Sequence, residues 1–439
     1  MSTNPIKIVA VIGSGPVGLA AAAHLLERGH EPVVLEAGPE VGHAVRQWGH
    51  VRLFSPWRYA TDPATLRLLA TTGWNAPAPD AYPTGDELVS QYIEPLARHP
   101  ALAGKVRVNA RVTASARSGF DKAKTAGREH ALFEVRYRNG KGDEVLYADA
   151  VIDASGTWFA PAPAGGNGLP AIGEPACAEQ IAYGMPDILG QARSRYAGRT
   201  VAVLGAGHSA MGSLIALVNL KQQVPSTKAI WLLRGDHPEK SFGGGANDQL
   251  AARGELGTTI AELVRSNQIE IETGFTVSSI EQHHERLRLV ARTHSNMRST
   301  DVDELIVATG FRPDLSFLGE LRLDLDPALE CASALAPLID PNEHSCGTVR
   351  PHGARELSHP DRGFYIAGMK SYGRAPTFLL LTGYEQVRSI AAAIDGDFEA
   401  ANRLELMLPE TGVCSVANTP PTEPATDAST SCGAPTCCA

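Results

Sequence analysis

The chain has 439 residues, of which 43% are hydrophobic and 20% are charged, and its formal net charge is −9. This composition is that of a globular protein with two or three domains. The acidic balance and the lack of a basic block argue against a nucleic-acid partner.

No run of 18 apolar residues occurs outside the stretch 8–26, which a glycine-rich segment interrupts. We therefore expect neither a signal peptide nor a membrane span. The seven cysteines are an odd number and widely scattered, unlike the cysteines of a secreted disulfide framework. These features predict a cytoplasmic protein.

Residues 7–36 predict the first half of a dinucleotide-binding fold. The apolar run Ile8–Ile12 has the β-branched content of a buried parallel strand. An Ala-rich helix follows through Leu26, and a second strand over 32–35 closes the unit. A strand, a glycine turn, a helix and a second strand in this order are what a dinucleotide site requires.

The glycine turn of this unit has G-x-G-x-x-G spacing. Gly13 permits the tight turn, Gly15 lets the backbone approach a pyrophosphate, and Gly18 lets the helix and strand pack closely. Pro16 belongs to the same predicted site. Glu36 would accept hydrogen bonds from ribose hydroxyls and disfavour a 2′-phosphate, which favours FAD or NAD over NADP. The alternative is a glycine-rich turn that binds nothing.

The segment 37–59 combines loop-forming glycines with aromatic and basic side chains. Directly after a dinucleotide unit, such a loop suits a flat ring system and its phosphates. Arg46, Trp48 and Ser55 are the residues that we expect near this ring. An equally weighted alternative is a structural loop whose aromatic side chains anchor it to the core.

Composition and alternation predict the elements that follow in the chain. Residues 60–100 predict helices interrupted by prolines, one of them opened by a capping box at 84–87. Further on we expect a strand over 106–112, a charged turn over 121–130, a hairpin around 139–142, a strand ending in Ala-Ser-Gly over 150–156, and a linker over 161–170.

The second half repeats the plan of the first. The apolar strand 200–204 leads into Gly205 and Gly207, with Ala210 where a third glycine would stand. The strand after the next helix ends in Arg234 rather than in an acid, which suits a 2′-phosphate and favours NADPH. Ser209, at the start of the helix, could contact phosphate. His208 beside it is read as a local hydrogen-bonding residue.

The segment 302–310 ends this half in Ala-Thr-Gly and matches the earlier Ala-Ser-Gly. The closing segment predicts a strand over 364–367, a loop containing Gly368, and a helix from about Pro376. The start of that helix, near Thr377, would favour negative charge on a reduced ring.

Two dinucleotide folds with the second inserted in the first resemble the flavoprotein superfamily of disulfide reductases and class B flavin monooxygenases. This resemblance covers roughly residues 5–400 and implies an α/β fold with two Rossmann-like domains. It also implies that the first binds FAD and the second NADPH, with Val112, Gly156 and Gly310 among the cofactor-binding residues. The expected domains are 1–162 and 319–410 for FAD, 163–318 for NADPH, and a flexible tail, 411–439.

Departures from the superfamily pattern indicate the subgroup. Neither C-x-x-x-x-C after Glu36 nor C-x-x-C in the second fold is present. The monooxygenase fingerprint F-x-G-x-x-x-H-x-x-x-[WY] is also missing, and 181–196 takes its place. Met369 replaces the usual acid after the last strand, as in many class B members. The phrases QWGHVRLFSPW, YGMPDILG, VLGAGHSAMGSL and ATGFRPDLSFL resemble monooxygenase-like proteins of bacterial arsenic-resistance operons.

The C-terminal tail carries three closely spaced cysteines, Cys432, Cys437 and Cys438. Adjacent thiols suit a soft ion such as As(III) or Hg(II), and a vicinal pair at the end of the chain resembles the thiols of mercuric reductase. The alternative is a disordered end whose thiols have no function, since 418–436 is rich in Pro, Thr, Ala and Ser.

The expected function is an FAD- and NADPH-dependent oxidoreductase of monooxygenase type. It would form a flavin C4a-(hydro)peroxide with O₂ and oxidise a soft nucleophilic atom of a small molecule, with a link to arsenic resistance. No side chain is assigned as a catalyst. Two alternatives stay open: a flavin or thiol–metal reductase that uses the terminal cysteine pair, and a non-enzymatic metalloid or redox sensor. A homodimer is also left open.

Overall fold

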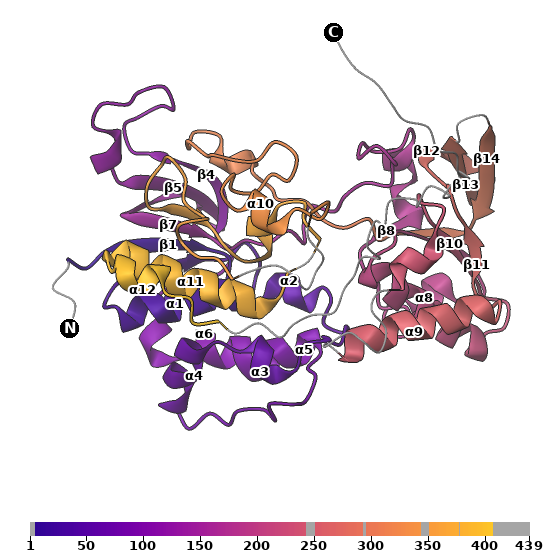
Figure 1. Ribbon diagram of the computed structural model, residues 1–439, viewed down its shortest axis with the longest axis horizontal. Helices are drawn as coiled ribbons and strands as arrows, with labels where there is room; N and C mark the ends of the chain where they lie inside the picture. Colours follow the sequence, from indigo (N-terminus) through magenta and orange to yellow (C-terminus); the bar gives the residue numbers. More distant parts are fainter. Residues whose placement is uncertain (1–4, 243–250, 293–295, 344–350, 377, 407–439) are drawn as a thin grey trace, which may run out of the picture.

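The structure is a computed structural model that describes residues 5–242, 251–292, 296–343, 351–376 and 378–406. The chain forms two lobes that lie side by side (Figure 1). The first contains both the N-terminal and the last described segments, and the second is built from the middle of the chain. No helix in these ranges is long and apolar enough to span a membrane.

The first lobe is organised around a parallel sheet with the strand order β16-β7-β1-β2-β3. Its strands are β1 Ile8–Ile12, β2 Glu31–Leu35, β3 Val106–Arg107, β7 Ala150–Asp153 and β16 Phe364–Ile366. Helix α1 (Pro16–Glu27) connects β1 to β2 and packs against α11 (Leu380–Asp395). The apolar strand residues 9–12 and 33–35 and the Ala-rich face of α1 are buried, as their composition predicts.

The second lobe repeats this arrangement with the strand order β11-β10-β9-β15-β8. Its strands are β8 Ile181–Tyr183, β9 Thr200–Leu204, β10 Lys228–Leu232, β11 Glu270–Glu272 and β15 Glu304–Val307, and its long helices are α8 His208–Gln223 and α9 Ala251–Arg265. The matching orders confirm the predicted α/β fold with two Rossmann-like halves.

Each lobe also carries a three-stranded antiparallel sheet. The first consists of β4 Arg111–Arg117, β5 Phe133–Asn139 and β6 Gly142–Ala148, and the second of β12 Val277–His283, β13 Arg286–Arg292 and β14 Met297–Val302. The predicted hairpin is the turn between β5 and β6, where Asn139 pairs with Gly142.

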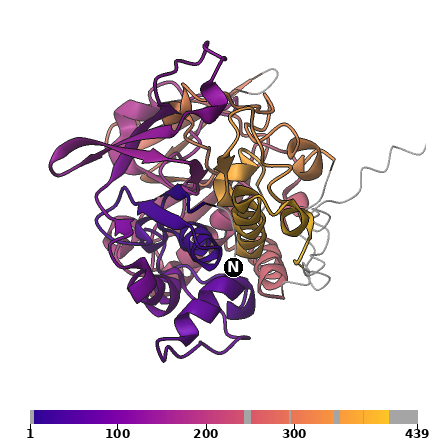
Figure 2. The ribbon, with the colours of Figure 1, turned by 90° about the vertical axis from the view of Figure 1, so that its left-hand side faces the viewer.

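The chain segment that connects β2 to β3 forms several short helices, which cover part of the first lobe (Figure 2). They are α2 His43–Arg46, α3 Trp57–Ala60, α4 Pro63–Ala70, α5 Gly85–Leu88 and α6 Glu94–Ala97, with a π-helical turn, Val89–Ile93, before α6. The capping box is confirmed, since Thr84 accepts from the Glu87 backbone and Glu87 accepts from the Thr84 backbone. The remaining helices are α7 Arg193–Tyr196, α10 Ala336–Ile339 and α12 Phe398–Asn402.

Two predicted elements are corrected. The strand expected over 106–112 is divided between β3 and β4 because Asn109, at φ 53°, turns the chain from one sheet to the other. Asn is among the residues that tolerate this left-handed conformation. The helix expected from Pro376 begins only at Leu380.

The two connections between the lobes pair with each other. Ala162 N donates to Gly310 O at 2.9 Å, and Arg312 N donates to Ala160 O at 2.8 Å. The chain therefore leaves the first lobe near residue 160 and returns near residue 312. Leu318 already packs in the core of the first lobe.

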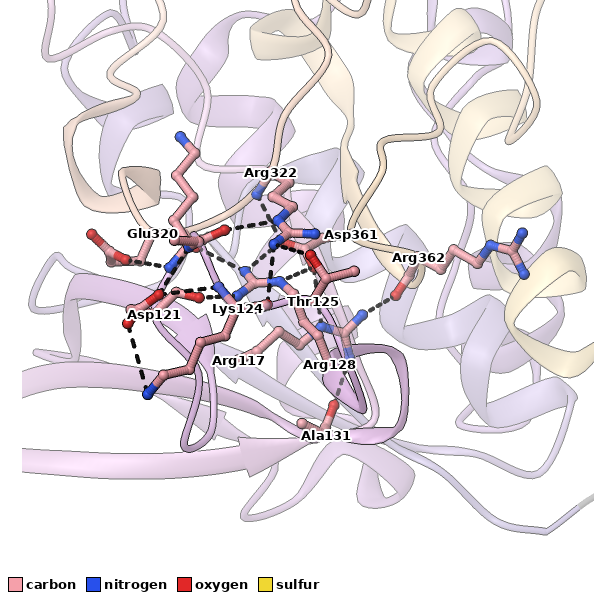
Figure 3. A network of polar contacts seen from close by, with 12 residues as sticks. Arg117, Asp121, Lys124, Thr125, Arg128, Ala131, Glu320, Arg322, Asp361 and Arg362 are labelled. Carbon is pink, nitrogen blue, oxygen red and sulfur yellow. Dashed lines mark hydrogen bonds and ion pairs between the residues drawn. The ribbon is translucent and has the colours of Figure 1, made fainter.

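The charged turn over 121–130 is anchored by a buried ion cluster (Figure 3). Arg128 donates to both carboxylate oxygens of Asp361, at 2.9 and 2.8 Å, and the Arg322 backbone adds a third bond at 2.7 Å. Arg117 lies 3.5 Å from the same carboxylate. Burial alone raises the pKa of Asp361, but these donors outweigh it and the net pKa is lowered. The cluster thus joins the turn to the segment that returns from the second lobe.

Candidate functional site: two glycine turns and a cationic cavity

In the first glycine turn, two of the three glycines are crowded by backbone atoms, and the third faces open space. Gly13 has φ 98°, and a Cβ on it would lie 2.7 Å from the Ala154 carbonyl oxygen. A Cβ on Gly18 would clash with the Gly13 carbonyl. A Cβ on Gly15 meets nothing within 4 Å, so the backbone is open there, at the N-terminus of α1. This is the geometry that a pyrophosphate requires.

Glu36 is a buried acid that also holds the turn together. One carboxylate oxygen accepts from the Ser14 backbone at 2.8 Å and the Ser14 hydroxyl at 2.7 Å. The other accepts from Gly38 N at 2.8 Å. Each oxygen has two acceptor positions, so capacity for a ribose hydroxyl remains. Ala110 N donates to Glu36 O at 2.7 Å, which brings the approach to β4 and Val112 beside this acid.

A buried ion pair that sequence reasoning missed lies at the end of β7. The Lys370 ammonium is 2.6 Å from the Asp153 carboxylate and 3.2 Å from the Ser155 hydroxyl, and both charged side chains are 0% exposed. This pair joins the Ala-Ser-Gly loop, including Gly156, to the loop that begins at Gly368. Gly368 in turn packs against Val17 of α1. The residue that follows Met369 is therefore a buried, paired lysine.

The three residues expected near a ring have separate surroundings. Arg46 forms ion pairs with Glu40 and Glu94. Trp48 is partly buried against the core, with its ring over Gly85, which agrees with the alternative of aromatic anchoring. Ser55 is partly buried in the loop before α3. No hydrogen bond, ion pair or ring contact joins these three described residues to one another, and their placement near a flavin stays a prediction.

Aromatic side chains instead gather where the lobes meet. Trp158 and Phe311 stack with ring centroids 5.0 Å apart, one from each connection. Phe159 stacks on His43 at 5.8 Å. Phe54 lies 5.2 Å from His208, which places the loop after Glu36 against the start of α8. In the sequence, these aromatic residues were marked only by their position, either shortly after an Ala-Ser/Thr-Gly motif or within the loop 37–59.

The second glycine turn has the same construction as the first. Gly205 has φ 137°, and a Cβ on it would clash with the Ala308 carbonyl, just as Gly13 faces Ala154. Gly207 has open space at its Cβ position, like Gly15. Ala210, in the third glycine's place, is fully buried, and Ser209 is partly buried in the first turn of α8.

A cavity of about 1010 Å³ opens at this second turn. It lies beyond the carboxyl ends of β9 and β10, where open α/β sheets bind ligands. Its lining includes Gly205, Arg234 and Arg312, with Thr309 next to the predicted residue Gly310. Arg234 is exposed and donates to the Gly166 carbonyl at 3.2 Å.

The segment predicted to be a linker forms one wall of this cavity. Glu174, which is 2% exposed, accepts hydrogen bonds from Ala164 N and Ala171 N and from the Tyr183 hydroxyl at 2.6 Å. Burial and this carboxylate raise the pKa of Tyr183. The glycine-rich stretch is therefore an ordered loop held by the Glu174 carboxylate. Glu174 is a further residue that the sequence did not indicate.

A family model described as pyridine nucleotide-disulphide oxidoreductase matches residues 10–332 and includes both glycine turns. The chain belongs to this family. Among curated protein sequences, none is similar enough to count as a relative. The two turns of this oxidoreductase fit two dinucleotides: the acidic Glu36 suits FAD at the first, and Arg234 suits NADPH at the second.

Solved structures with the same two-lobed fold include both reductases and monooxygenases. The bacillithiol disulfide reductase Bdr (YpdA) from Bacillus cereus has TM-score 0.63 and 20% identity, over 89% of this chain and 99% of that one. The cadaverine monooxygenase DfoA from Erwinia amylovora, bound to FAD, has TM-score 0.62 and 14% identity, over 94% and 100%. A flavin-containing monooxygenase from Stenotrophomonas maltophilia has TM-score 0.53 and 20% identity, over 90% and 99%.

Four predicted site residues lie outside the described residues of this family member: Thr377, Cys432, Cys437 and Cys438. Within the described ranges, no group of three or more His, Cys, Asp or Glu side chains is arranged to hold a metal ion. The predicted metalloid contact therefore stays a prediction about the tail.

Proposed function

We propose that this oxidoreductase binds FAD at the first glycine turn and NADPH in the cavity at the second, and acts as a monooxygenase on a small molecule. The observation that carries the proposal is the duplicated turn. In both turns the first glycine has a positive φ and faces an alanine carbonyl, Gly13 facing Ala154 and Gly205 facing Ala308. The second strands of the two units, however, end in opposite charges, Glu36 and Arg234.

The cysteines favour oxygen chemistry over dithiol chemistry in the described part of the chain. Cys177 and Cys331 are both free and buried, and they pack in the cores of different lobes. Burial raises the pKa of the Cys331 thiol to about 12 and also raises that of Cys177. A thiol held protonated is a poor nucleophile and a poor electron carrier.

The bound flavin would supply oxygen activation and the coenzyme would supply a hydride, while the chain binds and orients them. Gly15 and the N-terminus of α1 would receive the FAD pyrophosphate, and Glu36 would hold its ribose. Arg234 would pair with the 2′-phosphate of NADPH. The aromatic pairs at the junction of the lobes, among them Trp158 and Phe311, would exclude water between the two rings.

As substrate we propose a soft nucleophilic atom, in a trivalent arsenical or in a sulfur or nitrogen compound. The arsenical rests on the sequence phrases shared with the arsenic-operon group and on the terminal thiols. The second candidate function is a reductase that passes electrons to Cys437 and Cys438. Removal of residues 411–439 separates the two, because it would abolish a thiol-dependent reduction and leave a monooxygenase active.

The direct test supplies the full-length protein with FAD and measures the flavin that remains bound after gel filtration. NADPH oxidation and O₂ consumption are then followed with and without a trivalent arsenical, a thioether or an amine. We expect bound flavin and substrate-stimulated O₂ consumption in step with NADPH. A protein that retains no FAD would refute the proposal. NADPH oxidation no faster than with free flavin would indicate a sensor, and an O₂-independent turnover would indicate the reductase.

A further inference from the structure

The cavity at the second glycine turn has one wall residue that comes from the first lobe. Arg374 follows the 3₁₀ turn Gly368–Tyr372 and precedes α11, whereas the other lining residues in the described part of the chain fall between 162 and 312. This segment lies on the side of the first lobe that faces the second (Figure 1). A ligand in the cavity would therefore be in reach of both lobes.

Arg374 is held in place by Glu330 through a two-point ion pair. Its Nε and Nη2 atoms donate to the two carboxylate oxygens, each at 2.8 Å, and its backbone N donates to Leu329 O at 2.7 Å. This parallel geometry fixes the plane of the guanidinium. Of its five N–H donors, the described part of the chain engages two, which leaves three for a ligand.

The backbone around this pair is shaped to form it. Glu330 has φ 56°, a conformation that is uncommon for a residue other than glycine, asparagine or aspartate. Gly373 has the same φ, and a Cβ on it would clash with the Leu329 carbonyl, so the two segments lie in direct contact. This turn conformation places the Glu330 carboxylate against the Arg374 guanidinium.

The charges in the cavity match an anionic ligand. Among the described residues, three arginines line it, Arg234, Arg312 and Arg374, against one acid, Asp236. Arg234 lies at the end of β10, the position that contacts the adenosine ribose in dinucleotide-binding folds. Arg374 approaches from the lobe that would carry the flavin, towards which the nicotinamide ring must point for hydride transfer. The anion on that side is the pyrophosphate, which NADPH and NADH share.

We propose that Arg374 binds the pyrophosphate of the nicotinamide coenzyme across the junction of the lobes, and that Glu330 is the positioning residue that orients it. This inference rests on the proposed function, because it assumes that the coenzyme occupies this cavity. The coenzyme site would then be formed by both lobes. Arg374 would attract any pyridine dinucleotide, whereas Arg234 would select the phosphorylated coenzyme, NADPH.

The test titrates the full-length protein with NADP⁺ and with NAD⁺ by calorimetry. Arg374→Gln is expected to weaken both by the same factor, about tenfold or more, because a charge-assisted bond to phosphate is lost. Arg374→Lys keeps the charge without the planar fork and should fall between Arg374→Gln and wild type. Glu330→Gln should weaken both coenzymes by a smaller, equal factor. Arg234→Ala should weaken NADP⁺ alone.

Arg288 provides a matched control. Its Nε and Nη2 atoms donate to the two carboxylate oxygens of Asp301 at 2.8 and 3.0 Å, with an exposure comparable to that of the Arg374 pair, and neither residue lines the cavity. Arg288→Gln should change neither affinity. Unchanged affinities in Arg374→Gln, or a loss confined to NADP⁺, would overturn the assignment. If the wild-type protein binds neither coenzyme, both the proposed function and this inference are refuted. If the wild type binds coenzyme but Arg374→Gln binds it equally well, only the inference is refuted.

Discussion

The Lys370 ammonium lies 2.6 Å from the Asp153 carboxylate, and neither side chain has any exposed surface. A pair of this kind contributes little net stability while intact, but removal of one partner leaves an uncompensated buried charge. Asp153 precedes the Ala-Ser-Gly loop and Lys370 lies in the loop after β16, so the pair fixes both loops at the edge of the sheet where FAD is proposed to bind.

Asp153→Ala is therefore expected to lower the free energy of unfolding by about 3–5 kcal/mol. The double variant Asp153→Ala/Lys370→Met removes both charges and should recover a large part of this loss. Urea denaturation of the two variants and the wild type checks the result. A single variant as stable as wild type would show that the pair is not essential to the fold.

The glycine turns allow stability and binding to be separated. Gly15→Ala and Gly207→Ala place a methyl group in open space, so folding should change little. Each methyl would occupy the position where a phosphate approaches the backbone, so Gly15→Ala should reduce FAD retention and Gly207→Ala should reduce NADPH affinity. Gly13→Ala provides the contrast, because it meets the Ala154 carbonyl and should destabilise the fold itself. Thermal unfolding and bound-flavin absorbance distinguish these outcomes.

Coenzyme preference tests the interpretation of Arg234. Its replacement by Ala should raise the KM for NADPH at least tenfold and leave the KM for NADH nearly unchanged, since only NADPH carries the 2′-phosphate. Steady-state rates with both coenzymes give the comparison. Equal increases would remove the reason for assigning the phosphorylated coenzyme to this cavity.

A buried histidine makes stability depend on pH. His359 is 6% exposed, and burial lowers its pKa from 6.5 to about 4. The unfolded chain therefore binds a proton that the folded chain does not between these two values, so stability is complete above pH 6.5 and falls as the pH drops to about 4. The total loss from this group is about 3 kcal/mol.

His359→Phe should flatten the dependence of unfolding free energy on pH in this window, measured by urea titrations at several pH values. His130→Phe is the control, because the His130 side chain is 84% exposed and should leave the slope unchanged. Equal slopes in His359→Phe and wild type would assign the dependence to other groups.

Much of the nucleotide-binding framework could be predicted from the sequence because its signals are local. The run Ile8–Ile12 and the spacing of Gly13, Gly15 and Gly18 specify a strand, a turn and a helix within about twenty residues. The prediction for 106–112 was wrong for a local reason as well. Alternation continues through Asn109, and only its backbone conformation shows that the chain changes sheets.

The amino-acid sequence by itself determined that this chain has two dinucleotide folds whose second strands end in opposite charges, Glu36 and Arg234. Only the tertiary structure decided which distant residues meet. Asp153 and Lys370 are 217 positions apart, and Arg128 reaches Asp361 across 233. Contacts at such separation depend on how strands order in a sheet and where loops cross between lobes, and no periodicity along the chain encodes them. The position of Arg374 in the cavity at the second glycine turn is the consequence with the greatest bearing on the proposed function.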